Sequence, residues 1–190
     1  MKVSEADALI VVDVQNDFCP GGALPVPNGD AVARVANLLQ HKIDRVFFTR
    51  DWHPQDHCSF ADEPEYVDQS WPTHCVQDSP GAEFHGDLRV PLDAPIISKG
   101  TDPDREAYSG FQGTDLADQL RAGGYTRVFV AGLATDYCVK ATVLDALKNG
   151  FEAVVVEDGC RGIDEAGCKA ALMEMREAGA TIARSVEVTL

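Results

Sequence analysis

Hydrophobic residues gather in six short runs along the chain, at residues 8–12, 45–49, 95–98, 127–131, 152–156 and 180–183. The runs are rich in Val, Ile, Phe and Ala, and turn residues bound them. Because they show no alternation of apolar and polar positions, both faces of each strand should be covered. The pattern therefore predicts six strands in the interior of a layered fold.

Helical patterns lie between these runs. Apolar residues recur with helical spacing in 30–41, and three further helices are expected at 114–122, 138–148 and 164–178, each followed by Gly or Asn-Gly. The alternation of strand and helix predicts an α/β fold in which a doubly wound parallel sheet is the middle of three α/β/α layers. No repeat or polar linker divides residues 1–190, so we expect a single domain.

One connection breaks this alternation. Residues 50–94 contain Trp, His, Cys and Pro but no amphipathic helical pattern. Loops of this length inside a compact domain are usually functional. We therefore expect this loop to contribute to a site.

Charge and cysteine content narrow the classes of function. The formal net charge is −15 with no Lys/Arg cluster, which argues against a nucleic-acid partner. The apolar run at 8–12 is too short for a signal peptide or a membrane span, so no membrane association is expected. The six cysteines show no CxxC spacing, and a chain of 190 residues does not need disulfides to fold. Reduced thiols and a cytoplasmic location are the expectation.

Polar residues follow four of the predicted strands. Asp13 comes after the first run, Asp51 and His53 after the second and Lys99 after the third, while the fourth runs into the turn before Cys138. In an open parallel sheet, ligands bind outside the carboxyl ends of the strands. We expect these side chains to meet at one edge.

Cys138 is a candidate nucleophile. It should begin a helix capped by Thr135 or Asp136, where free N–H groups and the helix dipole stabilise a thiolate, with a nearby Lys99 ammonium adding to this effect. No histidine is obviously placed as its base, which leaves Asp13. The alternatives are a buried apolar cysteine, a turn carboxylate and a solvated turn lysine.

A family resemblance appears when five segments are read together. They are Val-Asp-Val-Gln-Asn-Asp-Phe at 12–18, Thr-Arg-Asp-Trp-His-Pro at 49–54, Trp-Pro-Thr-His-Cys at 71–75, Lys-Gly at 99–100 and Gly-Leu-Ala-Thr-Asp-Tyr-Cys at 132–138. Over essentially its full length the chain resembles the nicotinamidases, of the pyrazinamidase type, in the isochorismatase-like cysteine hydrolase superfamily. The resemblance implies a six-stranded parallel sheet in the order 3-2-1-4-5-6.

The same resemblance implies a reaction. Nicotinamide would be hydrolysed to nicotinate and ammonia, which is a step of NAD salvage. Pyrazinamide would also be accepted as a substrate. Cys138 would form a thioester, Asp13 would act as general base and acid, and Lys99 would be their charge partner. The N–H groups of Ala134 and Cys138 would bind the oxyanion, next to a cis peptide between Leu133 and Ala134.

A metal site is implied as well. Asp51, His53 and His74 match the family's ligands for one divalent metal, and carboxylate with imidazole suits zinc foremost, with iron or manganese as alternatives. The pyridine nitrogen of the substrate would take an open position on that metal. The resemblance leaves open whether His57 is a fourth ligand, and the alternative for the whole set is a group of ordinary polar loop residues.

Two aromatic residues match the walls of the family's pocket. Phe18 and Trp71 would hold the pyridine ring between them, unless they are plain core residues. Tyr108 matches a bordering segment, but packing in a turn explains it nearly as well, so it stays outside the predicted site. The expected partner is a small molecule, nicotinamide or a close analogue, and a homo-oligomer is left open.

Three other functions compete with this one. The first is another cysteine amidase of the superfamily, acting without metal on a carbamoyl or open-chain amide; the set Asp51, His53 and His74 argues against it. The second is isochorismatase chemistry, which needs no nucleophilic cysteine and so conflicts with Cys138. The third is a relative that binds nicotinamide or metal without catalysis.

Overall fold

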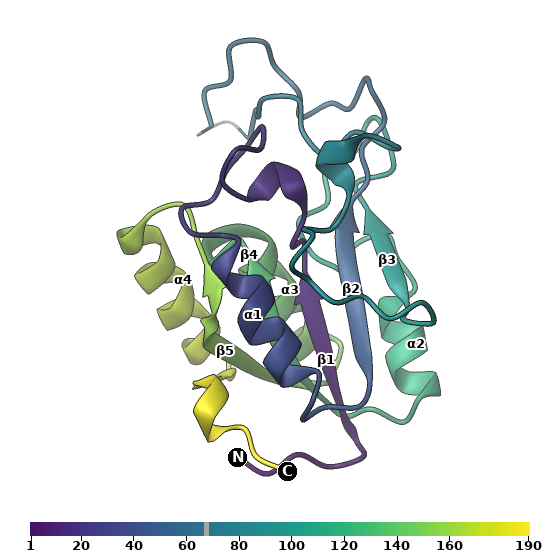
Figure 1. Ribbon diagram of the computed structural model, residues 1–190, viewed down its shortest axis with the longest axis vertical. Coiled ribbons are helices and arrows are strands. Elements are labelled where there is room, and N and C mark those ends of the chain that lie inside the picture. The colour runs from purple at the N-terminus through teal and green to yellow at the C-terminus, as the bar shows by residue number, and fades with distance from the viewer. Residues whose placement is uncertain (67–68) are drawn as a thin grey trace.

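A six-stranded sheet is the centre of the protein. The computed structural model describes residues 1–66 and 69–190, and in them all strand pairs are parallel, in the order β3-β2-β1-β4-β5-β6. Figure 1 shows the strands, which are β1 (Asp7–Val12), β2 (Val46–Asp51), β3 (Ile96–Lys99), β4 (Arg127–Leu133), β5 (Glu152–Arg161) and β6 (Thr181–Ala183). The predicted order is confirmed.

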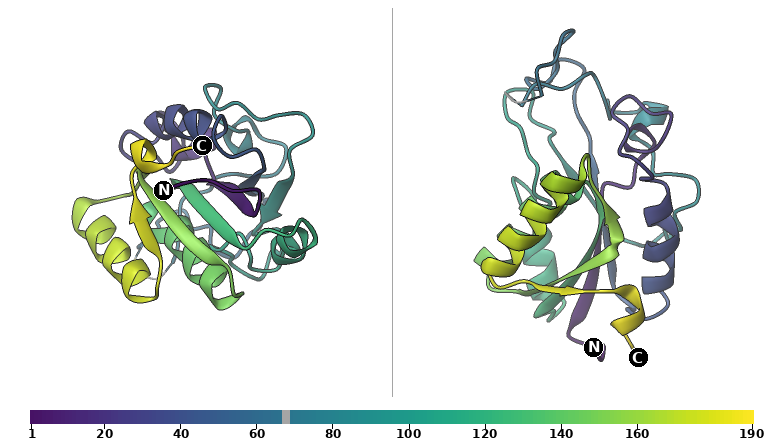
Figure 2. Two further views of the ribbon diagram at one scale, coloured as in Figure 1. Left: turned by 90° about the horizontal axis from the view of Figure 1, so that it is seen from below. Right: turned by 90° about the vertical axis from the view of Figure 1, so that its left-hand side faces the viewer.

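Helices cover both faces of this sheet, as predicted. Figure 2 shows α1 (Ala31–Leu39) on one side and α2 (Leu116–Ala122), α3 (Lys140–Lys148) and α4 (Glu165–Glu177) on the other. Single turns complete the fold: 3-10 turns η1 (Asn16–Phe18), η2 (Pro80–Ala82) and η4 (Ser185–Glu187), and the π-turn η3 (Thr135–Val139). Within the described ranges, every helix is too short or too polar to cross a bilayer.

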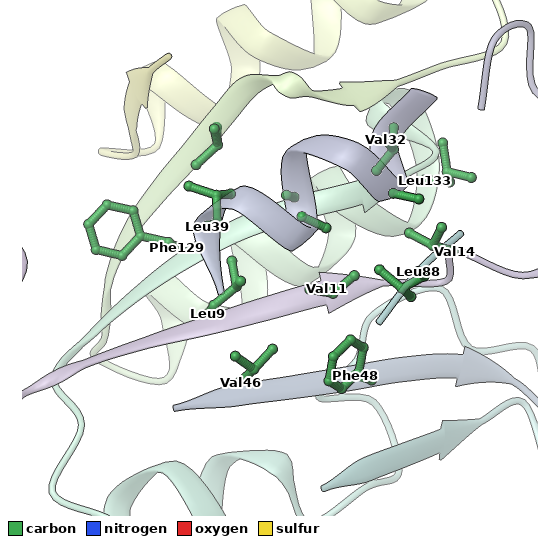
Figure 3. Packing of buried hydrophobic residues seen from close by; sticks show 14 of the residues in the cluster. Leu9, Val11, Val14, Val32, Leu39, Val46, Phe48, Leu88, Phe129 and Leu133 are labelled. Atoms are coloured by element: carbon green, nitrogen blue, oxygen red, sulfur yellow. The ribbon is translucent and has the colours of Figure 1, made fainter. Parts of the chain in front are cut away.

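The core lies on both sides of the central strand. Leu9 and Val11 of β1 pack under α1 against Val32 and Leu39 (Figure 3). Ile10 belongs to the cluster on the opposite face, with residues of α2, α3 and α4. All five side chains are fully buried. This explains why the strand reads as a continuous apolar run.

The main departure from the predicted elements is the length of β5. The apolar run ends at residue 156, but the strand continues to Arg161, because the chain pairs again with β4 beyond an irregularity and sets Cys160 opposite Gly132. Strand β2 also extends further than predicted, so Asp51 is its last residue. Most other ends differ by one or two residues, as helix and strand ends commonly do.

The long loop after β2 contains no α-helix in its described residues. It forms the 3-10 turn η2 and single bridges that pair His53 with Val76 and Phe60 with Trp71. Figure 1 shows it above the carboxyl ends of β2 and β3. Residues 67–68 of the predicted loop lie outside the described residues.

Candidate active site and metal centre

Four strand ends deliver polar side chains to one edge of the sheet. Asp13 follows β1, Asp51 ends β2, Lys99 ends β3, and Cys138 lies in the π-turn after β4. All four residues are buried. The structure thus brings together the residues that the strand pattern selected.

The Lys99 ammonium is the centre of this cluster. Its Nζ lies 2.9 Å from Asp13 Oδ2 and 3.4 Å from Cys138 Sγ, and it also contacts Asp51 Oδ1. A further hydrogen bond from Nζ to the Ala107 carbonyl is 3.2 Å long. The ammonium of Lys99 therefore contacts both carboxylates and the thiol.

Asp13 is oriented by a second residue that the sequence did not point to. The Thr49 hydroxyl donates a hydrogen bond of 2.6 Å to Asp13 Oδ1, so that Oδ2 faces Lys99. Asp13 itself has a left-handed backbone with φ of 49°, which is uncommon for a residue with a side chain. The carboxylate is held from both sides.

The pKa values follow from burial and from this ion cluster. Burial raises the pKa of the Asp13 carboxyl although Lys99 opposes it, and burial raises the pKa of the Cys138 thiol well above its ordinary value. For Lys99 the carboxylates of Asp13 and Asp51 outweigh burial and raise the pKa. Burial thus favours the neutral thiol of Cys138, whereas the charge of Lys99 favours the thiolate, as expected from the sequence.

The local backbone also differs from the predicted helix start. Cys138 lies inside the π-turn Thr135–Val139, which leads into α3, and Ala134 occupies the cap position without a side-chain capping bond. Neither Thr135 nor Asp136 caps this turn, because the Asp136 carboxylate accepts instead from the N–H of Ile163. Pi-turns of this kind are frequent at functional sites.

The turn before Cys138 contains the expected cis peptide, between Leu133 and Ala134. Gly132 precedes it with φ of 143°, and a Cβ there would lie 2.1 Å from the Val12 carbonyl oxygen. Only glycine permits β4 to approach β1 so closely. The backbone of the turn is thereby set beside the thiol.

A set of candidate metal ligands lies next to this cluster. One ligand atom each from Asp51, His53 and His74 can be chosen within 4.8 Å of one another, and all three residues are buried. Nδ1 of His53 lies 2.9 Å from the Gly100 carbonyl, and Nδ1 of His74 lies 2.7 Å from that of Pro72. Since a carbonyl only accepts, both Nδ1 atoms carry the proton and both Nε2 lone pairs are free for a metal.

Burial of His53 supports this assignment. Its Nε2 is buried, has no hydrogen-bond partner in the described residues and lies 3.6 Å from Asp51 Oδ2. A buried polar atom without a partner is costly, and a bound cation would satisfy it. Burial lowers the pKa of His74, which favours the neutral form that ligates metals. The residues fit a divalent metal.

His57 is committed elsewhere in this structure. Its ring stacks on that of His53 with centroids 4.1 Å apart. Nδ1 lies 2.8 Å from the Ser59 hydroxyl, and Nε2 lies 3.2 Å from the Arg105 carbonyl, to which it must donate. Because both ring nitrogens are hydrogen-bonded, neither is free to bind a metal in this structure. The ring of His57 packs against that of the candidate ligand His53.

Gln15 is another residue that the sequence did not assign. Its amide donates to the carbonyl oxygens of Asp51 and Ala82 and accepts the N–H of Asp51. Asp51 is thereby fixed through its backbone, while its carboxylate serves both Lys99 and the metal set. In the sequence, the signal that could have identified Gln15 is its position two residues after Asp13, on the segment that follows β1.

Aromatic residues line a cavity that also borders Cys138, Asp51 and His74. The predicted residues Phe18 and Trp71 both line it. Tyr108 accepts a 3.0 Å hydrogen bond from the Trp71 indole, and the Tyr137 ring stands edge-on to that indole at 5.2 Å. The structure therefore adds both tyrosines to the walls, and a flat ring of pyridine size suits them.

Comparison with known proteins identifies similar sequences and folds. The family model described as the isochorismatase domain matches residues 7–187. A nicotinamidase of Escherichia coli (strain K12) is 44% identical over 198 residues, covering 92% of this chain and 93% of that protein.

Two solved structures are similar over nearly their whole length. The pyrazinamidase of Pyrococcus horikoshii in complex with zinc has a TM-score of 0.83 and 48% identity, covering 94% of this chain and 99% of that one. PnC1 from L. infantum in complex with nicotinate has a TM-score of 0.90 and 37% identity, covering 100% and 98%.

Proposed function

Because the chain belongs to the isochorismatase domain family and is an amidohydrolase, we propose that it hydrolyses nicotinamide to nicotinate and ammonia. The observation that carries the proposal is the buried Cys138 thiol, within reach of Lys99 and Asp13, at the end of an aromatic cavity that also borders a metal set. The zinc-bound pyrazinamidase relative supports pyrazinamide as a second substrate. The resemblance assigns the reaction to NAD salvage.

The first half of the reaction forms a thioester. Cys138 Sγ attacks the carboxamide carbon while Asp13 takes the thiol proton, which the raised pKa of its carboxyl allows it to hold. The tetrahedral intermediate then collapses, the C–N bond breaks, and Asp13 returns the proton to the leaving nitrogen as ammonia. Lys99 stays charged and keeps both groups in register.

The second half releases the acid. Asp13 takes a proton from water, the resulting oxygen nucleophile attacks the thioester carbon, and the C–S bond breaks. The proton held by Asp13 returns to the thiolate of Cys138, and the acid releases its remaining proton to solvent and leaves as the nicotinate anion. Both halves use the same base and the same nucleophile, so loss of either group stops turnover.

Backbone donors are assigned to the developing oxyanion. We assign this role to the N–H groups of Ala134 and Cys138. Ala134 follows the cis peptide bond and precedes the π-turn, and Cys138 lies within that turn. Loss of one such donor typically raises the barrier by roughly 3 to 4 kcal/mol. Cys138 is buried, and Ala134 is half-buried at the wall of the cavity.

Asp51, His53 and His74 would hold the metal, for which zinc is our first assignment, with iron and manganese as alternatives. When bound, the metal supplies a Lewis-acid position for the ring nitrogen of the substrate. His53 and His74 present Nε2 because their Nδ1 protons are bound to carbonyls. Phe18 and Trp71 orient the ring from the sides.

Ammonia release from nicotinamide tests the nucleophile. The wild type and the control Cys168→Ala should turn over, and Cys138→Ala should not, since Cys168 lies outside the cluster. Undiminished turnover by Cys138→Ala would refute the assignment.

Chelation tests the metal separately. Removing the metal should raise the KM for nicotinamide but leave that for benzamide, which lacks the ring nitrogen, nearly unchanged. If chelation changes neither constant, a metal-free amidase is the better description.

A further inference from the structure

Residues 105–108 form a short segment that touches separate parts of the site. The Ala107 carbonyl accepts a 3.2 Å hydrogen bond from Lys99, and the Tyr108 hydroxyl accepts one of 3.0 Å from Trp71. The segment is thus tied to the ion cluster at one residue and to the ring wall at the next. A side chain beside these anchors has a defined position.

Glu106 is the residue next to these anchors, and it lines the cavity. Its Oε1 accepts a 2.8 Å hydrogen bond from the N–H of Ala107, which fixes the side chain. A carboxylate oxygen lies within 4.8 Å of ring nitrogens of His53 and His57. The carboxylate is therefore a built part of the wall and only half-buried.

Glu106 differs from the other acidic residue that lines the cavity. Asp51 is paired with Lys99, whereas among residues 1–66 and 69–190 Glu106 forms no ion pair. No Lys or Arg side chain of the described residues pairs with this carboxylate, which lies beside the imidazoles of His53 and His57 on the cavity wall. In such a confined site, charges a few ångströms apart are weakly screened.

The reaction proposed above changes the charge of the ligand in this cavity. Nicotinamide enters neutral, and nicotinate is an anion that must leave. A carboxylate without a Lys or Arg partner on the wall has little effect on the first and disfavours binding of the second. We propose that Glu106 is a specificity-determining residue that discriminates the amide substrate from its acid product, so that the acid does not block the site; this inference rests on the proposed function.

The test compares Glu106→Gln with a matched control. Asp104→Asn removes the same charge two residues before Glu106, but Asp104 is exposed and does not line the cavity. Product inhibition by nicotinate, inhibition by pyridine and the KM for nicotinamide are measured for both variants and the wild type. In Glu106→Gln the inhibition constant for nicotinate should fall about threefold or more, while the other two constants change less than about twofold. Asp104→Asn should match the wild type throughout.

Three results would overturn the inference. One is an unchanged nicotinate constant in Glu106→Gln, and another is a parallel change for nicotinate, pyridine and nicotinamide, which would mean that Glu106 only shapes the cavity. The third is loss of bound metal from Glu106→Gln, measured by elemental analysis at a chelator concentration that leaves the wild type loaded.

Calorimetry separates this inference from the proposed function. If the wild type releases no ammonia from nicotinamide, the proposed function fails. Titration of nicotinate and nicotinamide into wild type and Glu106→Gln then still measures whether the charge of Glu106 discriminates acid from amide, and equal acid-to-amide affinity ratios in the two proteins would overturn the inference.

Discussion

Gly100→Ala should weaken metal binding although Gly100 is not itself one of the proposed metal ligands. Gly100 has φ of 61°, and a Cβ on it would lie 2.4 Å from Cε1 and 2.6 Å from Nδ1 of His53. Real Cβ contacts are essentially never that short, so the imidazole must move and its 2.9 Å bond to the Gly100 carbonyl must break. Loss of such a supporting bond typically costs 10- to 100-fold in metal affinity, so we expect roughly that loss.

The strained backbone contributes a separate cost that a control can remove. An alanine in the left-handed region costs roughly 1–2 kcal/mol of stability wherever it stands. Gly124 has φ of 76°, and a Cβ added there would have no atom within 4 Å, so Gly124→Ala carries the backbone strain alone. Gly100→Ala should therefore lose at least as much stability as Gly124→Ala in thermal unfolding.

Metal retention distinguishes the two variants. Elemental analysis after dialysis against a chelator series should give a midpoint about one to two orders of magnitude lower for Gly100→Ala than for Gly124→Ala. KM for nicotinamide should rise with metal loss. Equal midpoints for the two variants would refute the argument that the Gly100 carbonyl sets the tautomer of a metal-binding His53.

Two further changes test other parts of the structure. Thr49→Val removes the donor to Asp13 at nearly constant volume, so kcat should fall about 10- to 100-fold with little change in KM, and Thr49→Ser should restore most of it; equal kcat for the valine and serine variants would contradict this. Asp7 is buried; burial raises the pKa of its carboxyl, but hydrogen bonds from Arg127 and Ser4 outweigh this effect, so the pKa is lowered. The contribution of Asp7 to stability is therefore present at neutral pH and is lost as the pH falls through the lowered pKa. Asp7→Asn should therefore unfold with about 1–2 kcal/mol less free energy at pH 7 in urea titrations, and the deficit should shrink below about pH 4; a deficit independent of pH would contradict the ion-pair account.

The strands and the edge that holds the site were predictable from local patterns, whereas the order of the strands came from the family resemblance. Uninterrupted apolar runs mark strands buried on both faces, and the residue after each run must emerge at the same edge of a parallel sheet. Asp13 and Lys99 were found in this way, since each directly follows such a run. This part of the prediction needs only the pattern of apolar residues along the chain and the parallel direction of the strands.

Other features depend on contacts between distant residues. The end of β5 was missed because Glu157 breaks the apolar run, while pairing with β4 carries the strand on to Arg161. Thr49 had no pattern of its own in sequence to mark it, and its partner Asp13 lies 36 positions away. Such roles come from register between strands, which no local pattern encodes.

By itself, the amino-acid sequence determined the order of the layers, the edge of the sheet and the side chains available there. Only the tertiary structure decided how those side chains behave. Burial raises the pKa of the Cys138 thiol, Lys99 binds Asp51 as well as Asp13, and the Gly100 carbonyl determines which nitrogen of His53 carries the proton. The physical reason is that protonation and tautomer depend on desolvation and on the nearest charges, and packing of separate strands creates both.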